Sequence, residues 1–361
     1  MSEIFSIASS LKSYEVELNP SSISLGIDTP SDYIVVDGNV HRLWPSLKLN
    51  DPIIIEAFEQ NKVLSTVGGI VEDLRAKGAS RSTELLAIGG GIIQDVSTFS
   101  ASCFMRGVKW SYAPTTLLGM VDSCIGGKSS INVGQYKNIA GNFYPPEKIL
   151  IDTQFCKTLS EQQLVEGLCE SVKICFAYSE QRFLDYLNLI DLESSLHEID
   201  FNKVVSFSLK TKKKFIEEDE FDNGIRLLLN FGHTFGHALE SASEYKISHG
   251  VAVGLGMFSA YKQSVLLGLI EEENLLVDLL MRHVRSLLKR VKGLDALIKD
   301  LDMQLALEGF KSDKKHLKDE YIAILYGSKS NLVRYKFSKN HYHEQCVLES
   351  FEYLRGLNFE I

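Results

Sequence analysis

The feature that most constrains the fold is a strand-to-helix unit at residues 84–107, ELLAIGGGIIQDVSTFSASCFMRG. An apolar run leads directly into three consecutive glycines, and a helical pattern that carries Asp95 follows. Upstream, YIVVDGNV at 33–40 is another apolar run that ends in turn residues, as a buried parallel strand does. Because strands and helices alternate along this part of the chain, the sequence predicts an α/β domain with a parallel sheet.

The glycine turn also suggests a binding site. Glycines at a strand-to-helix turn let a phosphate approach the backbone and the amides that begin the helix. The spacing is not the GxGxxG fingerprint, so a dinucleotide site and a plain tight turn both remain open. Further along, Gly126, Gly127 and Lys128, and then Lys137 and Asn138, form a cationic loop rich in backbone amides. Such a loop favours contact with an anion.

Helical periodicity dominates the second half of the chain. Ser160 precedes the pattern, and Gln163 completes a capping box. The helical signal continues with breaks to about residue 299, and YIAILYG and NLVRYKF then predict a late strand or hairpin. The sequence therefore predicts an N-terminal α/β domain over residues 1–152 and a mainly helical domain over residues 153–361.

Residues 226–250, RLLLNFGHTFGHALESASEYKISHG, concentrate side chains that can bind a metal. His233 and His237 are four apart in a helical pattern, so both imidazoles project from one face about one turn apart. A polar break follows, from which His249 can fold back towards His233. Histidines at this spacing also occur as plain core or surface residues, so the spacing by itself leaves both interpretations open.

Two glycines favour the metal interpretation. Gly232 and Gly236 directly precede the two histidines, and glycine inside a helix costs up to ~1 kcal/mol relative to alanine. We expect a metal or substrate to approach the backbone there, with close helix packing as the alternative. In the preceding helix, Glu170 and Lys173 are three apart, and this spacing alone indicates only a surface ion pair.

Charge and composition exclude several classes of protein. The formal net charge of -9 argues against non-specific binding of nucleic acid. There is no run of ~18 apolar residues, and the first residues lack the basic head and apolar core of a signal peptide. The six cysteines include no CxxC pair. We expect a cytoplasmic protein that binds neither nucleic acid nor a membrane.

Together these segments resemble one family, the 3-dehydroquinate synthases and related sugar phosphate cyclases. The matching blocks, which run in the family's order through most of residues 84–257, are GGGIIQD, FMRG, PTTLLGMVDSCIGGKSSIN, YKNIAGNFYPP, LIDTQFCKTL, EGLCESVK, RLLLNFGHTFGHALE and SHGVAVGLGM. The resemblance implies a Rossmann-like domain that binds NAD, a helical C-terminal domain, and a divalent metal, usually zinc, with cobalt as the alternative. It also implies a homodimer.

The resemblance assigns roles to individual residues. The implied metal ligands are Glu170, His233 and His249, a set that suits a catalytic zinc. The residues implied to line the NAD site are Asp37, Asn39, Glu59, Lys62, Gly90, Gly91, Asp95, Thr115, Thr116, Lys137, Phe155, Thr158 and Leu159. The residues implied to face the substrate are Asp122, Lys128, Asn138, Lys173, Lys212, Arg226 and Asn230, with His237, Lys314 and, from the neighbouring subunit, Arg106 near its phosphate.

The implied activity is conversion of 3-deoxy-D-arabino-heptulosonate 7-phosphate to 3-dehydroquinate and phosphate, with NAD used catalytically. Arg226 with Lys212 would suit the substrate carboxylate. The alternatives are another cyclase, such as one that uses sedoheptulose 7-phosphate, a metal-dependent polyol dehydrogenase, or a non-catalytic homologue. One departure stands out: Val251 follows SHG where the family usually has a glutamate, so a partner for a metal ligand is expected to be missing.

Overall fold

The structure is a computed structural model that describes residues 3–19, 33–134, 136–270, 274–327 and 331–359. The chain divides into two compact units, which are described one at a time. The first contains residues 1–159 and 200–220, and the second contains residues 160–199 and 221–361. Within the described ranges, no helix has both the length and the apolar character needed to cross a membrane.

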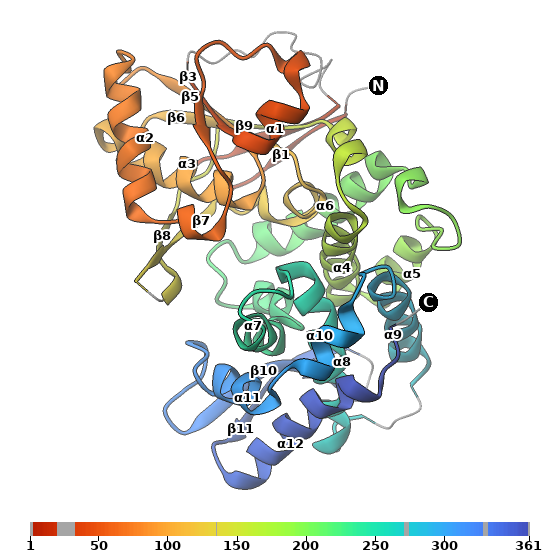
Figure 1. Ribbon diagram of the computed structural model, residues 1–361. Coiled ribbons are helices and arrows are strands. Elements are labelled where there is room, and N and C mark those ends of the chain that lie inside the picture. The colour runs from red at the N-terminus through yellow and green to blue at the C-terminus, as the bar shows by residue number, and fades with distance from the viewer. Residues whose placement is uncertain (1–2, 20–32, 135, 271–273, 328–330, 360–361) are drawn as a thin grey trace. The chain divides into compact units, whose positions relative to one another are not determined.

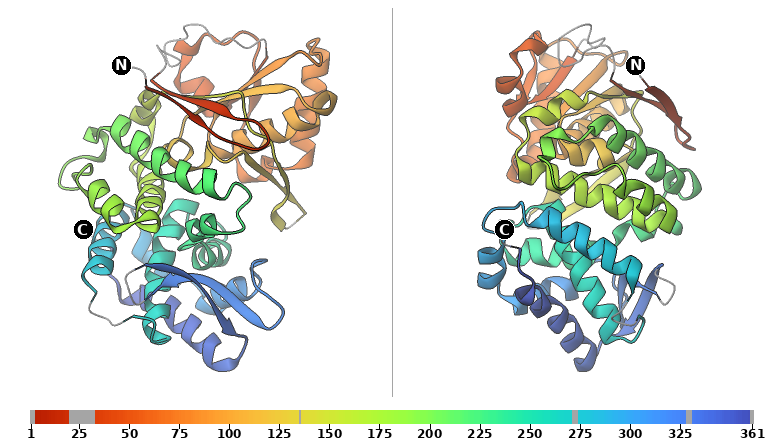
Figure 2. Two further views of the ribbon diagram at one scale, coloured as in Figure 1. Left: turned by 180° about the vertical axis from the view of Figure 1, so that it is seen from behind. Right: turned by 90° about the vertical axis from the view of Figure 1, so that its right-hand side faces the viewer.

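The first unit is built on a seven-stranded sheet with the order β1-β2-β9-β6-β5-β3-β4 (Figure 1). Its strands are β1 (Glu3–Ile7), β2 (Tyr14–Leu18), β3 (Tyr33–Asp37), β4 (Ile53–Ile55), β5 (Glu84–Gly89), β6 (Lys109–Pro114) and β9 (Lys148–Ile151). Only β1 pairs antiparallel, in the hairpin with β2 that Figure 2 shows in dark red. The parallel sheet predicted from strand and helix alternation is confirmed.

Helices cover this sheet because its central strands are apolar on both faces. The helices of this unit are α1 (Gly38–Leu43), α2 (Leu64–Ala76), α3 (Gly91–Cys103) and α6 (Phe201–Glu218). In β5, residues 85–89 are all buried, and α3 packs on β5 next to α2. A separate antiparallel hairpin, β7 (Lys128–Val133) and β8 (Tyr136–Phe143), also packs on α3. The cationic loop of the sequence is therefore an ordered hairpin.

The first unit does not stop where the sequence pattern changes. It runs past residue 152 to the end of the 3-10 helix η5 (Thr153–Thr158), and it includes α6, which lies far along the helical part of the chain. Helix α6 packs against η5 and against the π-helical turn η4 (Gly119–Ser123). Helical periodicity cannot reveal this, because it shows that a helix has an apolar face and not which unit covers that face.

The second unit is mainly helical, as predicted. Its helices are α4 (Glu161–Tyr178), α5 (Glu180–Leu187), α7 (His233–Ala242), α8 (His249–Leu266), α9 (Leu275–Leu288), α10 (Leu294–Asp300), α11 (Met303–Lys311) and α12 (His341–Glu352). Helix α8 is buried along most of its length, between α4, α7, α9 and α12. Strands β10 (Glu320–Tyr326) and β11 (Leu332–Ser338) pair antiparallel, which confirms the predicted late hairpin.

Candidate functional site

Three side chains from three helices of the second unit converge on one point. Glu170 lies in α4, and His233 and His249 are the first residues of α7 and α8. The Glu170 Oε1 atom lies 3.4 Å from His233 Nε2 and 3.5 Å from His249 Nε2. Tetrahedral ligands bonded to zinc at about 2.0–2.1 Å are about 3.3 Å apart. The spacing therefore fits three ligands of one divalent cation.

Glu170 has the properties of an ion ligand. Its side chain is fully buried, and among the described residues neither oxygen accepts a hydrogen bond of good geometry. Lys173, one turn along α4, forms an ion pair with Oε2. Burial alone would raise the pKa of Glu170, but Lys173 and His249 outweigh it and lower the pKa to about 2. A buried carboxylate in this state is stabilised by a bound cation.

His237 is a third imidazole at the same place. Ring nitrogens of His233, His237 and His249 lie within 4.8 Å of one another, so an all-histidine site is an alternative. The set with Glu170 is favoured because its carboxylate reaches two imidazoles and carries a charge that neutralises the cation. The His237 side chain stays partly open to solvent. Surrounding protein atoms, and then the Lys315 ammonium, lower its pKa, so the ring is neutral near pH 7.

A tight turn between α7 and α8 brings His249 back to His233, as predicted. Glu244 and Tyr245 adopt left-handed backbone conformations, with φ of 52° and 63°. The Ser243 hydroxyl accepts a hydrogen bond from the backbone N–H of Ile247 at 3.2 Å. The ring centres of His233 and His249 are consequently 5.2 Å apart.

Gly232 and Gly236 let α7 pack directly on α8. A Cβ on Gly236 would lie 2.9 Å from the backbone oxygen of Ala252, and one on Gly232, which has φ +76°, would lie 2.7 Å from that of Val253. A Cβ on Gly256 would lie 2.0 Å from the Gly232 oxygen. The expectation that a metal or substrate approaches these glycines is wrong. Close helix packing explains them.

The two histidines that are candidate metal ligands also have partners at Nδ1, the ring nitrogen that faces away from Glu170. His233 Nδ1 lies 3.2 Å from the backbone oxygen of Phe231, and His249 Nδ1 lies 3.2 Å from Glu240 Oε2. The valine at position 251 is buried and provides no carboxylate. The expectation that a partner is missing is nevertheless wrong, because Glu240 supplies it from α7. A carboxylate three residues after His237 in a histidine-rich helix was the available sequence signal.

The residues expected to face the substrate are divided between the units. In the second unit, Arg226 is buried in the 3-10 helix η7 (Ile225–Asn230), and Asn230 Nδ2 donates to the Leu227 oxygen at 3.1 Å. In the first unit, Lys212 of α6 pairs with Asp122 at 2.7 Å. The combination of Arg226 and Lys212 into one anion pocket stays a prediction.

The late lysine segment follows α11. Lys314 is exposed, whereas Lys315 is half-buried and pairs with Asp313 at 3.4 Å. Burial lowers the pKa of Lys315 although Asp313 opposes the shift. Lys315 also acts on the pKa of His237. Lys315 is therefore a candidate that the sequence analysis did not single out, and the role of Lys314 stays a prediction.

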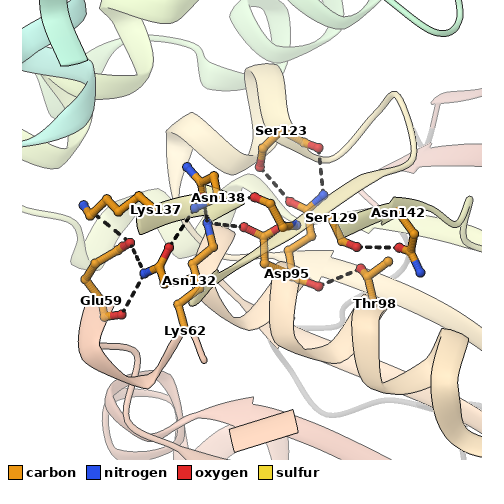
Figure 3. Close-up of polar contacts among 12 residues, drawn as sticks. Glu59, Lys62, Asp95, Thr98, Ser123, Ser129, Asn132, Lys137, Asn138 and Asn142 are labelled. Carbon is orange, nitrogen blue, oxygen red and sulfur yellow. Dashed lines mark hydrogen bonds and ion pairs between the residues drawn. The ribbon is translucent and has the colours of Figure 1, made fainter. Parts of the chain in front are cut away.

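A second polar cluster lies in the first unit (Figure 3). Lys62 pairs with Asp95 of α3 at 2.5 Å and donates to Asn138 Oδ1 at 2.7 Å. Asn132 donates to Glu59 Oε1 at 2.8 Å and accepts from the backbone N–H of Asn138 at 2.9 Å. The cluster joins α3 to the β7–β8 hairpin. Asn132 is the member that the sequence analysis missed, because its role depends on a fold-level contact.

Lys137 and Lys128 of the β7–β8 hairpin have different surroundings. Lys137 in β8 pairs with Glu59 at 3.4 Å. Lys128, at the start of β7, is exposed and lies over the Phe143 ring at 5.9 Å from its centre. Asp95 also accepts from the backbone N–H of Ser130 at 2.9 Å. The structure brings together Glu59, Lys62, Asp95 and Lys137, the residues implied to bind NAD, and adds Asn138, which was expected to face the substrate. The contacts of these residues with NAD and with the substrate stay predictions.

The remaining expected cofactor residues lie where strands of the parallel sheet end. Asp37 accepts from the Asn39 N–H at 2.9 Å and begins α1, and burial raises the pKa of Asp37. A Cβ on Gly91 would meet no atom within 4 Å, so the glycine turn leaves space at the start of α3. The other residues in this group are Gly90, Thr115 and Thr116 after β5 and β6, and Phe155, Thr158 and Leu159 after β9.

Two further observations complete the first unit. The indole N–H of Trp44 donates to Thr158 Oγ1 at 3.1 Å, and its ring packs edge-on against Phe155 with centres 4.9 Å apart. Arg106, expected to reach a neighbouring subunit, is exposed in a turn with φ 69°. In open α/β sheets, ligands bind at the carboxyl ends of the strands, where Phe155 and Thr158 lie, whereas Arg106 precedes β6 and lies at the amino end of that strand.

The fold and the metal-ligand geometry define a class of protein: enzymes that combine a Rossmann-like α/β unit with a helical unit that carries a divalent metal centre. The model of the 3-dehydroquinate synthase N-terminal domain matches residues 52–166, and that of the C-terminal domain matches residues 167–316. The chain belongs to the 3-dehydroquinate synthase family.

Curated relatives support this assignment. A 3-dehydroquinate synthase of Alkaliphilus metalliredigens is 35% identical over 312 residues, which cover 83% of this chain and 84% of the relative. One of Dehalococcoides mccartyi is 40% identical over 258 residues, which cover 71% of this chain and 70% of the relative.

Solved structures agree on the fold. The 2-epi-5-epi-valiolone synthase of Streptomyces hygroscopicus subsp. jinggangensis 5008, with NAD+ and Zn2+ bound, has a TM-score of 0.78 at 25% identity and covers 96% of this chain and 99% of its own. A 2-deoxy-scyllo-inosose synthase has a TM-score of 0.80 at 23% identity, with coverage of 97% and 99%. The predicted fold class is confirmed.

Proposed function

We propose that this protein is a 3-dehydroquinate synthase, a phosphate-eliminating lyase that depends on NAD and a divalent metal. The observation that carries the proposal is the convergence of Glu170, His233 and His249 in a member of that family. The related valiolone synthase binds NAD+ and Zn2+, which supports the same two groups here. We infer zinc as the metal, with cobalt able to replace it.

The bound groups would supply two kinds of chemistry: NAD takes up and returns a hydride, and the metal polarises substrate oxygens as a Lewis acid. Around them, Lys173 keeps Glu170 ionised. His237 is neutral and open to solvent, so a ring nitrogen can accept a hydrogen bond from the substrate. Arg226 offers the planar donor fork that matches the carboxylate of a keto acid phosphate.

The test is a product assay with 3-deoxy-D-arabino-heptulosonate 7-phosphate. The expected result is release of phosphate and formation of 3-dehydroquinate without accumulation of NADH. Sedoheptulose 7-phosphate is the comparison substrate, because a cyclase that uses this sugar phosphate is the alternative that the family resemblance leaves open. Cyclisation of the sugar phosphate in place of the keto acid phosphate would reassign the substrate. Accumulation of NADH with simple polyols would favour a dehydrogenase.

We also propose a homodimer in which the exposed Arg106 completes the phosphate site of the neighbouring subunit. Mixing Arg106→Ala subunits with His249→Ala subunits tests this. Each variant alone is expected to be inactive, and mixed dimers are expected to regain part of the activity, because one site then has both residues intact. No recovery after exchange of subunits, verified with differently tagged chains, would contradict it. We place the enzyme in the cytoplasm and in the shikimate pathway.

A further inference from the structure

We propose that Glu240 is a positioning residue of the metal centre, which holds the His249 ring so that Nε2 is the nitrogen presented to the cation. The inference rests on the proposed function, because that function assigns a divalent cation to Glu170, His233 and His249. It concerns a different question, namely which side chain determines the orientation and donor strength of one ligand.

The His249 ring lies between two carboxylates. Its Nδ1 is 3.2 Å from Glu240 Oε2, and its Nε2 is 3.5 Å from Glu170 Oε1. A neutral imidazole has one N–H donor and one lone pair, and an ionised carboxylate only accepts. With Glu240 accepting the Nδ1 proton, the lone pair is on Nε2, where it faces the position that a cation shared with Glu170 would take.

His233 provides an internal comparison. Its Nδ1 also has an acceptor at 3.2 Å, but this acceptor is the backbone oxygen of Phe231. Both rings therefore have the same tautomer, held by two different kinds of group. A backbone carbonyl is present whatever the side chain, whereas the carboxylate adds a negative charge that increases the basicity of the imidazole. Of the two histidines, only His249 has a side chain as the partner of its Nδ1 atom.

Contacts on both sides hold this arrangement in place. The backbone oxygen of Glu240 accepts from the N–H of Tyr245 at 2.8 Å and from the hydroxyl of Ser243 at 3.0 Å, which anchors the end of α7. On the other side, Gln162 Nε2 in α4 donates to Ser248 Oγ at 3.1 Å. These contacts locate the backbone before His249, and Glu240 then holds the Nδ1 side of the ring.

The exposure of the two side chains explains why the ring needs this contact. The His249 side chain is 37% exposed, so packing alone does not fix its rotation, whereas that of Glu240 is 13% exposed and has little freedom. Glu240 is not itself placed as a ligand, because it lies on the Nδ1 side of the ring. The metal-facing nitrogens lie on the other side, within reach of Glu170.

The experiment compares Glu240→Ala, Glu240→Gln and the matched control Glu244→Gln, which removes a charge from an exposed residue in the next turn. Zn2+ affinity is measured by competition with a chromophoric chelator, without any assay of turnover. Loss of a side chain that hydrogen-bonds a metal-ligating histidine typically weakens metal binding 10–100-fold. We expect that loss for Glu240→Ala, a smaller loss for Glu240→Gln, and a change of less than about twofold for the control.

Two further readouts separate positioning from folding and ligation. The melting temperature of each metal-free variant shows whether the fold is intact, and the visible absorption of the Co2+ form reports the number of ligands. An unchanged ligand number with weakened affinity supports the proposal. A Zn2+ affinity within about twofold of wild type in a folded Glu240→Ala protein would overturn it, as would loss of one ligand in the Co2+ spectrum. If Glu240→Ala does not fold, the affinity of Glu240→Gln decides by the same criterion.

Failure of this inference can be distinguished from failure of the proposed function. If wild-type protein binds Zn2+ but does not cyclise the keto acid phosphate, the function is wrong and the role of Glu240 is still decided by the affinities. If wild-type protein performs the cyclisation and Glu240→Ala binds Zn2+ normally, the function stands and Glu240 is not a positioning residue.

Discussion

Each of the two units places an enclosed or half-buried carboxylate beside a lysine, and the two carboxylates have different hydrogen-bond partners. In the first unit, Asp95 pairs with Lys62 and also accepts a hydrogen bond from the Ser130 backbone, so its polar atoms are used within the protein. In the second unit, Glu170 pairs with Lys173, yet within the described part of the chain neither oxygen accepts a well-formed hydrogen bond. The first arrangement is that of a scaffold. The second leaves bonding capacity for a ligand.

The pKa values of Asp95 and Glu170 are shifted in opposite directions by their surroundings. Burial is the dominant effect at Asp95 and raises its pKa although Lys62 opposes the shift. At Glu170 burial is outweighed by Lys173 and His249, and the pKa is lowered to about 2. The second unit thus concentrates basic groups around one carboxylate. Polar groups arranged for function in this way commonly reduce stability, whereas those of a scaffold increase it.

The largest expected effect comes from removing a ligand of the metal centre in the second unit. We expect His249→Ala to lose most bound zinc and to lower activity by about 10³-fold or more, because several kcal/mol of transition-state stabilisation depend on the metal. The fold should remain, since the side chain is 37% exposed. Metal content and kcat/KM are the measurements, and His341→Ala, an exposed histidine of the same unit, is the control. Unchanged metal content would refute the ligand assignment.

The next effect concerns the scaffold carboxylate. Lys62→Met leaves Asp95 buried without its cation, which is expected to lower the free energy of unfolding by about 3 kcal/mol. Urea denaturation measures the change. The double variant with Asp95→Leu should recover most of the loss, because an apolar pair of similar volume removes the uncompensated charge. If the single variant is as stable as wild type, Lys62 and Asp95 are not a scaffold pair.

Lys173→Met is the change in the second unit that corresponds to Lys62→Met in the first, and it tests whether the two carboxylates differ in their need for a cation. Lys173→Met removes the cation beside Glu170, so the metal-free protein is expected to be destabilised. Zn2+ at 100 times its Kd should then add about 2.7 kcal/mol, because a ligand that binds only the folded state stabilises it. Thermal unfolding with and without Zn2+ measures this. At one free Zn2+ concentration, Lys62→Met keeps all three metal ligands and should gain only as much stability as wild type, whereas Lys173→Met should gain more, because the cation then compensates Glu170. Equal gains for both variants would remove the distinction between the two units.

The smallest effects come from glycines. Gly236→Ala introduces a Cβ 2.9 Å from the Ala252 backbone oxygen and is expected to cost about 2 kcal/mol through overpacking of α7 on α8. Gly91→Ala meets no atom within 4 Å and is expected to add about 0.5 kcal/mol by reducing the entropy of the unfolded chain, while the KM for NAD rises. Effects of the same sign at both positions would contradict the structural difference between the two glycine segments.

The sequence predicted those features of the fold and of the site that depend on the local pattern of residues. The parallel sheet follows from apolar runs and glycine turns, and the return of His249 to His233 follows from the polar break between them. The motif matches brought in Glu170, which spacing alone had placed in a surface ion pair. Burial of Glu170 then shows why that first interpretation fails, because no surface pair is fully enclosed.

The sequence could not predict features that depend on packing between distant segments. Gly232 and Gly236 face α8, and Glu240 reaches His249 across a turn, so neither role is visible without the helix pairing. In the turn after α11, Lys315 is half-buried and lowers the pKa of His237, whereas its neighbour Lys314 is exposed. Two adjacent lysines cannot be distinguished by pattern alone.

The membership of α6 in the first unit has a consequence for synthesis on the ribosome. The first unit is complete only when residue 220 has emerged, about 60 residues after its main segment ends at residue 159. At translation rates of about 5–20 residues per second, this is a delay of roughly 3–12 s. Helices α4 and α5 of the second unit emerge during that interval. Until then, the surfaces of η4 and η5 that α6 covers in the folded unit remain exposed, which makes the protein a candidate client of chaperones that bind nascent chains.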